Sequence, residues 1–333
     1  MAKLVAAFGT SHSTMLLSPL ANWLKLFDHI DVKAPINDFA GKERSFQYLL
    51  EHLPADAKAR IAPDAVGRYF EDTSNAMARL KVDIAAAKLD VLVIVGDDQR
   101  EIFKDNCRPA IGLYTGATIR NAPAPSPLPE DWYYRDQAGR LEDGAERHYP
   151  CHPALATHLA AGLTERDFDI TAVAALVDGQ FEGHAYSFVH RKYLRDKPVA
   201  VVPVFLNTYY PPNVPTPGRC RDLGLALREL IDSFAADLRV GIMASGGLSH
   251  FLVNEALDDK VVAALRSRDL DTLAGLPAEL LRSGSSEIRN WICVSAAIAG
   301  LELEWLSYVP AYRSRALTGV GLCFAHWSRP GGT

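Results

Sequence analysis

The chain has 333 residues, of which 48% are hydrophobic and 23% are charged, so it contains enough apolar material for the core of a globular protein. The net charge of −5 argues against a basic surface for nucleic acid or for an anionic membrane, and no apolar run reaches the roughly 18–20 residues of a membrane-spanning helix. The five cysteines are scattered and form no CxxC pair, which argues against a disulfide framework or a zinc ribbon and predicts a reduced, cytoplasmic protein.

Five apolar runs have the length of β-strands. They are Leu4–Phe8, Val91–Val95, Ile170–Val177, Val199–Leu206 and Val240–Ala244. Continuous apolar runs of this length are typical of strands that are buried on both faces, as in a parallel or mixed sheet. The first run starts close to the N-terminus, so we expect those residues to form a buried strand rather than a leader peptide.

Helical patterns alternate with these strands. They cover Asn75–Lys88, Pro153–Arg166 and Arg219–Leu238. This alternation predicts an α/β fold in which helices flank a central parallel or mixed sheet. Residues 121–150 and 207–218 are rich in Pro, Gly and polar residues and are predicted as long loops that form a lid or the walls of a site. Because the alternation continues beyond the first loop, we expect a single domain over residues 1–333.

Polar residues follow each apolar run. They are His12 in "GTSHS", Asp97, Asp98 and Gln99 in "GDDQ", His184 in "DGQFEGH", Asn207 and Tyr209 in "NTY", and His250 in "SGGLSH". Sites in open α/β sheets lie at the carboxyl ends of the strands, so these residues predict one site at that edge. Each has a simpler explanation when taken alone, since a histidine can pack in a turn and "GDDQ" can cap a helix. The other seven histidines are expected at the surface or in packing.

Glu287 belongs to a predicted helix, "SSEIRNWICVSAAIAG", with Ser285 or Ser286 at its N-cap. A carboxylate in the first turn of a helix is stabilised by the helix dipole. That effect alone would explain a glutamate at this position, so the helix pattern does not by itself make Glu287 a candidate.

Six segments in this order, "GTSHS", "VGDDQREIF", "EGHAYSF", "NTYYPPNVPTPGRC", "ASGGLSHFL" and "SSEIRNW", resemble the class III extradiol ring-cleavage dioxygenases. This is the superfamily of the protocatechuate 4,5-dioxygenase catalytic (β) chain, with a gallate- and methylgallate-cleaving branch. The resemblance covers most of the chain and implies a single α/β domain with non-haem Fe(II). It also implies extradiol (meta) cleavage of a catecholic aromatic acid by O2 to a ring-opened semialdehyde-type product. A homo-oligomer is expected, with or without a small or duplicated partner subunit.

The resemblance also implies roles for five residues. His12 and Glu287 would be metal ligands, and Gln99 stands where the family often has a second metal histidine. His250 would be the acid/base histidine, and His184 would contact the substrate or oxygen. The substitution at position 99 leaves three outcomes open: Gln99 ligates, a neighbouring aspartate replaces it, or the site holds iron poorly or not at all.

Two further interpretations remain at this stage. One is a non-catalytic, metal-poor homologue that acts as the partner subunit of an active dioxygenase chain, which the glutamine favours. The other is a hydrolase that uses a different divalent metal with the same ligands. Among the aromatic residues, Tyr209 and Tyr210 could form pocket walls and residues 132–134 a lid, or all of them could be core or surface residues.

Overall fold

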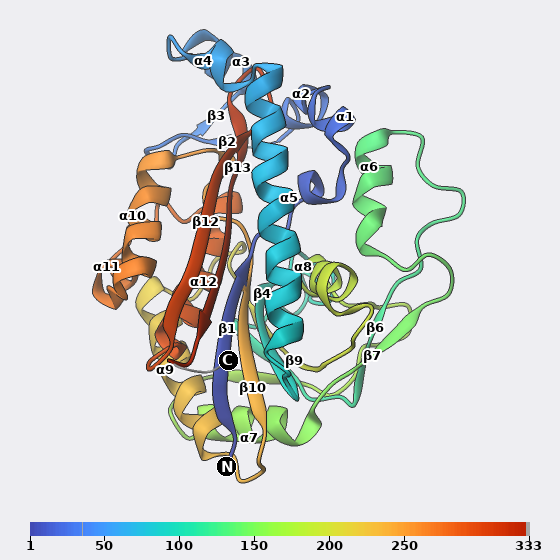
Figure 1. The fold of residues 1–333 in the computed structure, drawn as a ribbon, viewed down its shortest axis with the longest axis vertical. Coiled ribbons are helices and arrows are strands. Elements are labelled where there is room, and N and C mark those ends of the chain that lie inside the picture. The colour runs from blue at the N-terminus through green and yellow to red at the C-terminus, as the bar shows by residue number, and fades with distance from the viewer. Residues whose placement is uncertain (35, 331–333) are drawn as a thin grey trace.

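The computed structural model describes residues 1–34 and 36–330, and its centre is a nine-stranded sheet (Figure 1). Across the sheet the strands lie in the order β11 (His250–Leu252), β13 (Thr318–Ser328), β1 (Lys3–Thr10), β10 (Arg239–Ser245), β4 (Val91–Asp97), β9 (Ala200–Leu206), β5 (Ile111–Tyr114) and β8 (Ile170–Val173), and β12 (Glu302–Tyr312) pairs with β13. The four central strands β1, β10, β4 and β9 are parallel to one another. Antiparallel pairs lie on both sides of this group, so the sheet is mixed, as predicted.

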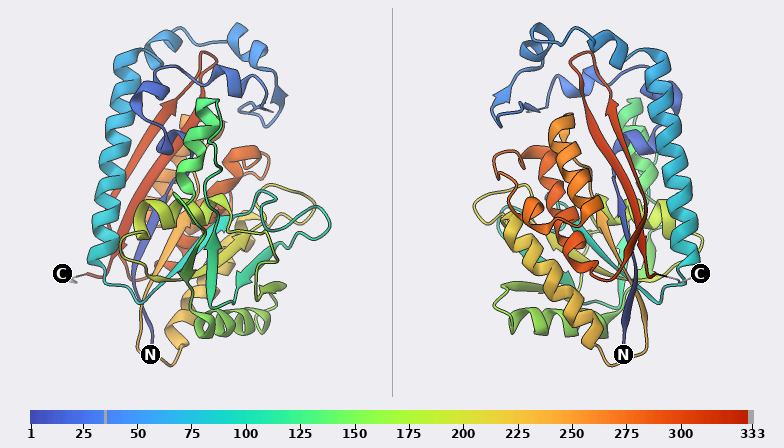
Figure 2. Two further views of the ribbon diagram at one scale, coloured as in Figure 1. Left: turned by 90° about the vertical axis from the view of Figure 1, so that its right-hand side faces the viewer. Right: turned by 60° about the vertical axis from the view of Figure 1, so that its left-hand side comes forward.

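Helices cover both faces of the sheet (Figure 2). On one face lie α7 (Pro153–Thr164), α9 (Pro217–Ser233), α10 (Glu255–Ser267), α11 (Leu270–Ala274) and α12 (Ile288–Ala297), and on the other lie α5 (Pro63–Ala86) and α8 (His184–Val189). Strand β4 shows why the sequence requires this: Val91, Val93 and Val95 pack into the first layer, whereas Leu92 and Ile94 pack into the second. Successive side chains of a strand point to opposite faces, so a strand covered on both sides must be apolar throughout. The α/β fold class is therefore confirmed.

Smaller elements surround this core. They are α1 (Leu20–Trp23), α2 (Asp28–Asp31), β2 (Ile36–Asn37), β3 (Glu43–Arg44), α3 (Phe46–Glu51), α4 (Ala57–Arg60), β6 (Thr118–Asn121), α6 (Trp132–Gln137) and β7 (Arg147–Pro150), with 3-10 turns over Thr14–Leu17, Ala138–Arg140 and Ser283–Glu287 and a π-helical turn over His190–Leu194. The three helices predicted between the strands correspond to the second half of α5 and to α7 and α9. No helix in the described part of the chain is long and apolar enough to cross a membrane.

The stretch 121–150 is less irregular than predicted. It contains α6, which Asp131 caps by accepting a hydrogen bond from the Tyr133 backbone N–H at 2.8 Å, and β7, which pairs with β6. The sequence pattern did not predict this short helix, because the prolines before residue 131 are typical of turns and of segments without regular structure. The second predicted loop remains irregular until α9 begins at Pro217.

The prediction that His184 follows a strand end at the site edge was wrong. Strand β5 is antiparallel to β9, and β8 is parallel to β5, so β8 ends at the edge opposite to the carboxyl ends of the central strands. It also ends at Val173 rather than at residue 177. Residues 174–183 connect the end of β8 to the start of α8. This connection returns the chain to the edge that carries the site and brings His184 there.

Candidate metal and active site

A cavity of about 260 Å³ lies at the carboxyl ends of the central strands. Its lining includes the five residues that the sequence pattern and the resemblance singled out, namely His12, Gln99, His184, His250 and Glu287. His12 follows β1, and Gln99 follows β4. His184 is the first residue of α8, His250 the first of β11, and Glu287 precedes α12. Residues that are 275 positions apart thus meet in one place because parallel strands end at a common edge.

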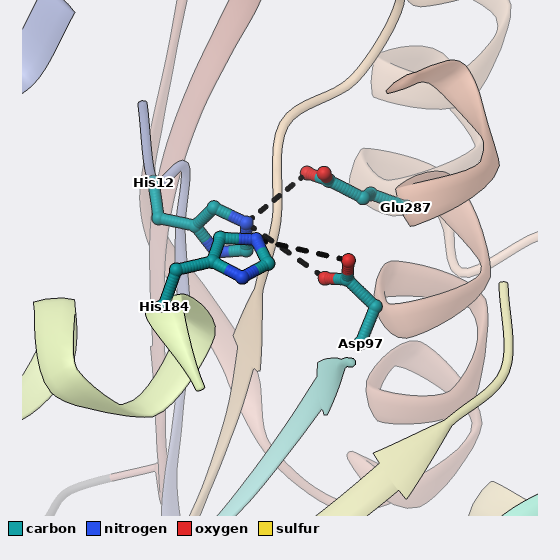
Figure 3. Close-up of side chains that lie close together, drawn as sticks. All are labelled: His12, Asp97, His184 and Glu287. Carbon is teal, nitrogen blue, oxygen red and sulfur yellow. Dashed lines mark ion pairs between the residues drawn. The ribbon is translucent and has the colours of Figure 1, made fainter. Parts of the chain in front are cut away.

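Four acidic and histidine side chains converge in this cavity (Figure 3). Nε2 of His12 lies 3.7 Å from Oδ1 of Asp97 and 3.5 Å from Oε2 of Glu287, and Nε2 of His184 lies 3.8 Å from Oδ2 of Asp97. One potential ligand atom from each of the four residues lies within 4.8 Å of the others. His12, Asp97 and Glu287 are buried, whereas His184 is partly exposed to the cavity.

The four residues fit a divalent cation. His12 Nε2 and Asp97 Oδ1 are buried and have no hydrogen-bond partner within the described residues, an arrangement that costs free energy unless another group engages them. Imidazole nitrogen and carboxylate oxygen are donors that suit non-haem Fe(II). Burial and the charge of Glu287 raise the pKa of Asp97. Burial alone would also raise the pKa of Glu287, but His250 and His12 lower it well below its usual value.

The hydrogen bonds of His12 fix which nitrogen faces the acidic groups. Its Nδ1 lies 2.9 Å from the hydroxyl oxygen of Ser245, and that hydroxyl donates to the carbonyl of Ala185 at 2.7 Å. Because the hydroxyl proton is used for the carbonyl, the serine oxygen accepts from Nδ1–H. The lone pair of His12 is therefore on Nε2, which points toward Asp97 and Glu287. Metal-binding histidines are commonly oriented by such a partner on the other ring nitrogen.

His250 and His184 are each held by an acceptor on Nδ1. For His250 it is the carbonyl of Leu248 at 2.9 Å, and Nε2 then faces Glu287 Oε1 at 3.3 Å. For His184 it is Glu101, whose carboxylate accepts from Nδ1 at 2.7 Å and from the backbone N–H at 2.8 Å. Burial alone would lower both histidine pKa values, but Glu287 raises that of His250, and Glu101 with Asp97 raises that of His184 to about 9.

The residues of the "GDDQ" segment make different contacts. Gln99 lines the cavity, and its amide nitrogen donates to Asp97 Oδ2 at 3.1 Å and to Glu287 Oε1 at 3.4 Å. Asp98 accepts from the backbone N–H groups of Ile102 and Phe103, which confirms the prediction that one aspartate caps the following turn. Gly96 is part of β4. A Cβ at that position would lie 2.9 Å from Cβ of Ala185 in α8, so glycine permits close packing of α8 on the strand.

Glu287 itself occupies the N-cap position of α12, where Ser285 or Ser286 was predicted, and its side chain makes no capping hydrogen bond. Its Oε2 instead accepts from the backbone N–H of Gly247 at 2.7 Å, in the glycine turn after β10. Trp291, one helical turn later, donates to the carbonyl of Gly246 at 2.8 Å. The carboxylate is therefore directed into the cavity and does not cap the helix.

Several residues of the site were not identified from the sequence. Asp97 was left open as an alternative to Gln99, and Glu101 was passed over although it lies in the same "GDDQREIF" segment. Of the aromatic candidates, Tyr209 and Tyr133 line the cavity. Trp132 instead packs against Phe27, and Tyr134 is exposed. The sequence pattern does not separate these neighbours because the direction of each side chain depends on the fold.

Residues 47–322 match the family described as the catalytic LigB subunit of aromatic ring-opening dioxygenase. The chain is 35% identical over 101 residues to a gallate dioxygenase of Pseudomonas putida, an alignment that covers 30% of this chain and 28% of the relative. It is 27% identical over 201 residues to a 2,3-dihydroxyphenylpropionate/2,3-dihydroxicinnamic acid 1,2-dioxygenase of Comamonas testosteroni, covering 60% of this chain and 54% of the relative.

These alignments thus span roughly a quarter and a half of the two curated relatives. Among solved structures, an uncharacterized protein of Escherichia coli K12 aligns over 98% of this chain and 100% of its own, with 14% identity and a TM-score of 0.42. The family match covers most of the chain and includes four of the five predicted site residues, Gln99, His184, His250 and Glu287. The chain therefore belongs to the LigB family, the catalytic subunits of the class III extradiol dioxygenases.

Proposed function

We propose that this protein is an Fe(II)-dependent extradiol dioxygenase that opens the ring of a catecholic aromatic acid with O2 to a semialdehyde-type product. The observation that carries the proposal is a pair of buried potential ligand atoms, His12 Nε2 and Asp97 Oδ1, which lie beside Glu287 and have no hydrogen-bond partner among the described residues. When bound there, Fe(II) would lower the pKa of the substrate hydroxyls and provide positions for the substrate and oxygen. The two relatives reported above are named gallate dioxygenase and 2,3-dihydroxyphenylpropionate/2,3-dihydroxicinnamic acid 1,2-dioxygenase, which supports the proposal.

For the metal ligands we propose His12, Asp97 and Glu287. Gln99, which the resemblance placed at the second histidine position, directs its amide nitrogen at both carboxylates, and an N–H group is a donor rather than a ligand. Asp97 supplies a carboxylate oxygen at the point where the family residue would supply a nitrogen. Direct ligation by the carbonyl oxygen of Gln99 is the alternative, and it requires the amide to turn over.

The two remaining histidines handle protons. His250 is held through Nδ1, so only Nε2 can accept or return a proton in the cavity, and its pKa depends on the charge of Glu287 at 3.3 Å. In the metal-free protein Glu101 and Asp97 raise the pKa of His184 to about 9, which favours the protonated ring, and we propose that its Nε2–H is a donor to the substrate or to oxygen. Replacement of a catalytic acid/base group slows turnover by about 10²–10⁴-fold, so H250Q should do so while the protein retains its iron.

We extend the proposal to the protein's surroundings. Its reaction partners would be a catecholic aromatic acid and O2, without nucleic acid or membrane. It would act as a homo-oligomer, with or without a small or duplicated partner subunit. The five cysteines are not in disulfides, in keeping with a reduced, cytoplasmic location.

The test is iron content after anaerobic purification, followed by O2 uptake with a panel of catechols. We expect wild type to bind iron, D97N to lose it and Q99L to keep it, with circular dichroism showing that each variant is folded. Q99H should bind iron at least as tightly, because imidazole at this position could add a ligand that the amide N–H of Gln99 does not supply. Loss of iron in Q99L with retention in D97N would instead assign the ligand to Gln99.

The same measurements decide the non-catalytic alternative, which the glutamine at position 99 favours. A protein purified without air that contains no iron, takes up no oxygen with any catechol and gains iron only as Q99H would be a metal-poor partner subunit. Hydrolytic activity that depends on zinc or manganese and consumes no oxygen would indicate the hydrolase.

A further inference from the structure

Two arginines line the cavity, and their charges are balanced to different extents. Arg313 is buried and makes two hydrogen bonds, 2.9 and 2.7 Å long, to the carboxylate of Asp31. Arg140 donates through one terminal nitrogen to the hydroxyl of Ser187 at 3.2 Å, and its Nε is buried without a partner in the described residues. A guanidinium has five N–H donors, so most of those on Arg140 have no hydrogen-bond partner in the part of the chain that the structure describes.

The carboxylate nearest to Arg140 is already engaged. Glu101 Oε1 lies 3.8 Å from the second terminal nitrogen of Arg140, which is longer than a hydrogen bond. Both oxygens of Glu101 accept from His184, one from the backbone N–H and one from the ring. Among the described residues, Arg140 therefore makes no hydrogen bond to a carboxylate, and its second terminal nitrogen has no partner within hydrogen-bond distance.

Arg140 lies on a wall of the cavity that is separate from the proposed metal ligands. Tyr133, Gln137 and Arg140 are spaced by four and three residues along α6 and the 3-10 turn after it, and all three line the cavity. This segment, shown in green in Figure 1, therefore forms one wall. Ser187 fixes Arg140 to α8, the helix that begins with His184, so the guanidinium lies next to a pocket histidine.

On the basis of the proposed function, we propose that Arg140 binds the carboxylate of the aromatic substrate and thereby selects rings that carry an acidic substituent. Guanidinium pairs with carboxylate through two parallel, charge-assisted hydrogen bonds, which a neutral substituent does not reproduce. The partly enclosed cavity strengthens this pairing, because there is less water to screen the charges. A ring held in the cavity would direct its hydroxyls to the metal held by His12, Asp97 and Glu287, and its carboxylate to Arg140.

The experiment compares R140M, R140K and the control R135M with wild type. Arg135 lies on the same helix but is exposed and outside the cavity lining, so R135M removes an equal charge from the other face of α6. The probes are 3,4-dihydroxybenzoate with 4-methylcatechol, and 3-(2,3-dihydroxyphenyl)propanoate with 3-propylcatechol. Each pair differs in the carboxylate, and each is measured by anaerobic calorimetric titration of iron-loaded protein and by O2 uptake.

We expect wild type to prefer at least one acid over its neutral counterpart, and R140M to reduce that preference by about 10- to 100-fold, the range for a lost charge-assisted hydrogen bond. R140K should retain part of the preference, and R135M all of it. A preference in R140M within threefold of wild type, or no preference in wild type, would overturn the inference. If binding depends on the carboxylate and on Arg140 but no O2 is taken up, the role of Arg140 is supported and the proposed dioxygenase activity is contradicted. If O2 is taken up but R140M keeps the wild-type preference, the dioxygenase activity is supported and the role of Arg140 is contradicted.

Discussion

The hydroxyl of Ser245 donates to Ala185 and accepts from His12, and this pair of hydrogen bonds determines the tautomer of the histidine that faces the acidic groups. We expect S245A to weaken iron binding by about 10- to 100-fold, which is typical when the outer partner of a metal histidine is removed. The control is S295A, because Ser295 is also buried but donates only to the carbonyl of Ile292 in α12. Competition with a coloured chelator measures both, and equal affinity in S245A and S295A would contradict the assignment.

The Glu101–His184 pair makes a second prediction at the residue scale, for the metal-free protein. Burial opposes both charges, yet His184 lowers the pKa of Glu101 to about 2, and Glu101 raises that of His184 to about 9. The lowered carboxyl pKa contributes stability above the ordinary value of 4.5 and loses it as pH falls through about 2. The raised histidine pKa contributes stability below 6.5 and loses it as pH rises through about 9.

The stabilisation by this pair is therefore complete between pH 4.5 and 6.5. We expect E101Q to reduce the free energy of unfolding more at about pH 5.5 than at about pH 9.5, where wild-type His184 has lost most of its proton. Urea titration in the presence of EDTA, with wild type and variant at both pH values, measures this difference. An equal loss at the two pH values would show that the pair is not ionic.

At the scale of elements, the site depends on how closely helix α12 packs on α9. Gly224 of α9 lies so near α12 that a Cβ there would be 1.9 Å from the carbonyl oxygen of Cys293. Backbone cannot move aside as a side chain can, so G224A should destabilise the protein by about 1–3 kcal/mol or more, the range for overpacking a core. Because α12 follows Glu287 directly, we also expect weaker iron binding in this variant.

The matched control is G218A in the first turn of the same helix, where a Cβ would meet nothing within 4 Å. There alanine should be neutral or slightly stabilising, since glycine costs about 1 kcal/mol relative to alanine within a helix. Thermal and urea unfolding of the two variants provide the comparison. Similar effects of G224A and G218A would mean that the helices separate without cost.

At the scale of the whole molecule, helix α2 near the start of the chain is joined to the turn between β12 and β13. Asp31 in α2 accepts two hydrogen bonds from Arg313, just after β12, and one from Thr318 at the start of β13. Removal of one member of a buried ion pair leaves an unpaired charge and typically costs about 3–5 kcal/mol. We expect D31A to show such a loss in urea unfolding, and D196A, which breaks the exposed pair with Lys81, to show almost none. Equal stability of the two variants would argue against this joint.

The apolar pattern was enough to predict the strands and helices whose signal is local. The continuous run at β4 indicated a strand covered on both faces, and the spacing in α9 indicated an amphipathic helix. The sequence also placed His12, His250 and Glu287 in one cavity, because these residues follow or precede well-marked elements and the family motifs fix their order.

Which residues within a motif face the cavity depends on contacts between distant segments. Asp97, Gln99 and Glu101 lie within five residues, and their different partners depend on how the end of β4 meets α8 and α12. The direction of β8, the position of β13 beside β1 and the approach of Arg140 to the cavity all depend on pairings between distant segments. Local periodicity carries no information about such contacts, because strand order and direction are set by the packing of the whole sheet.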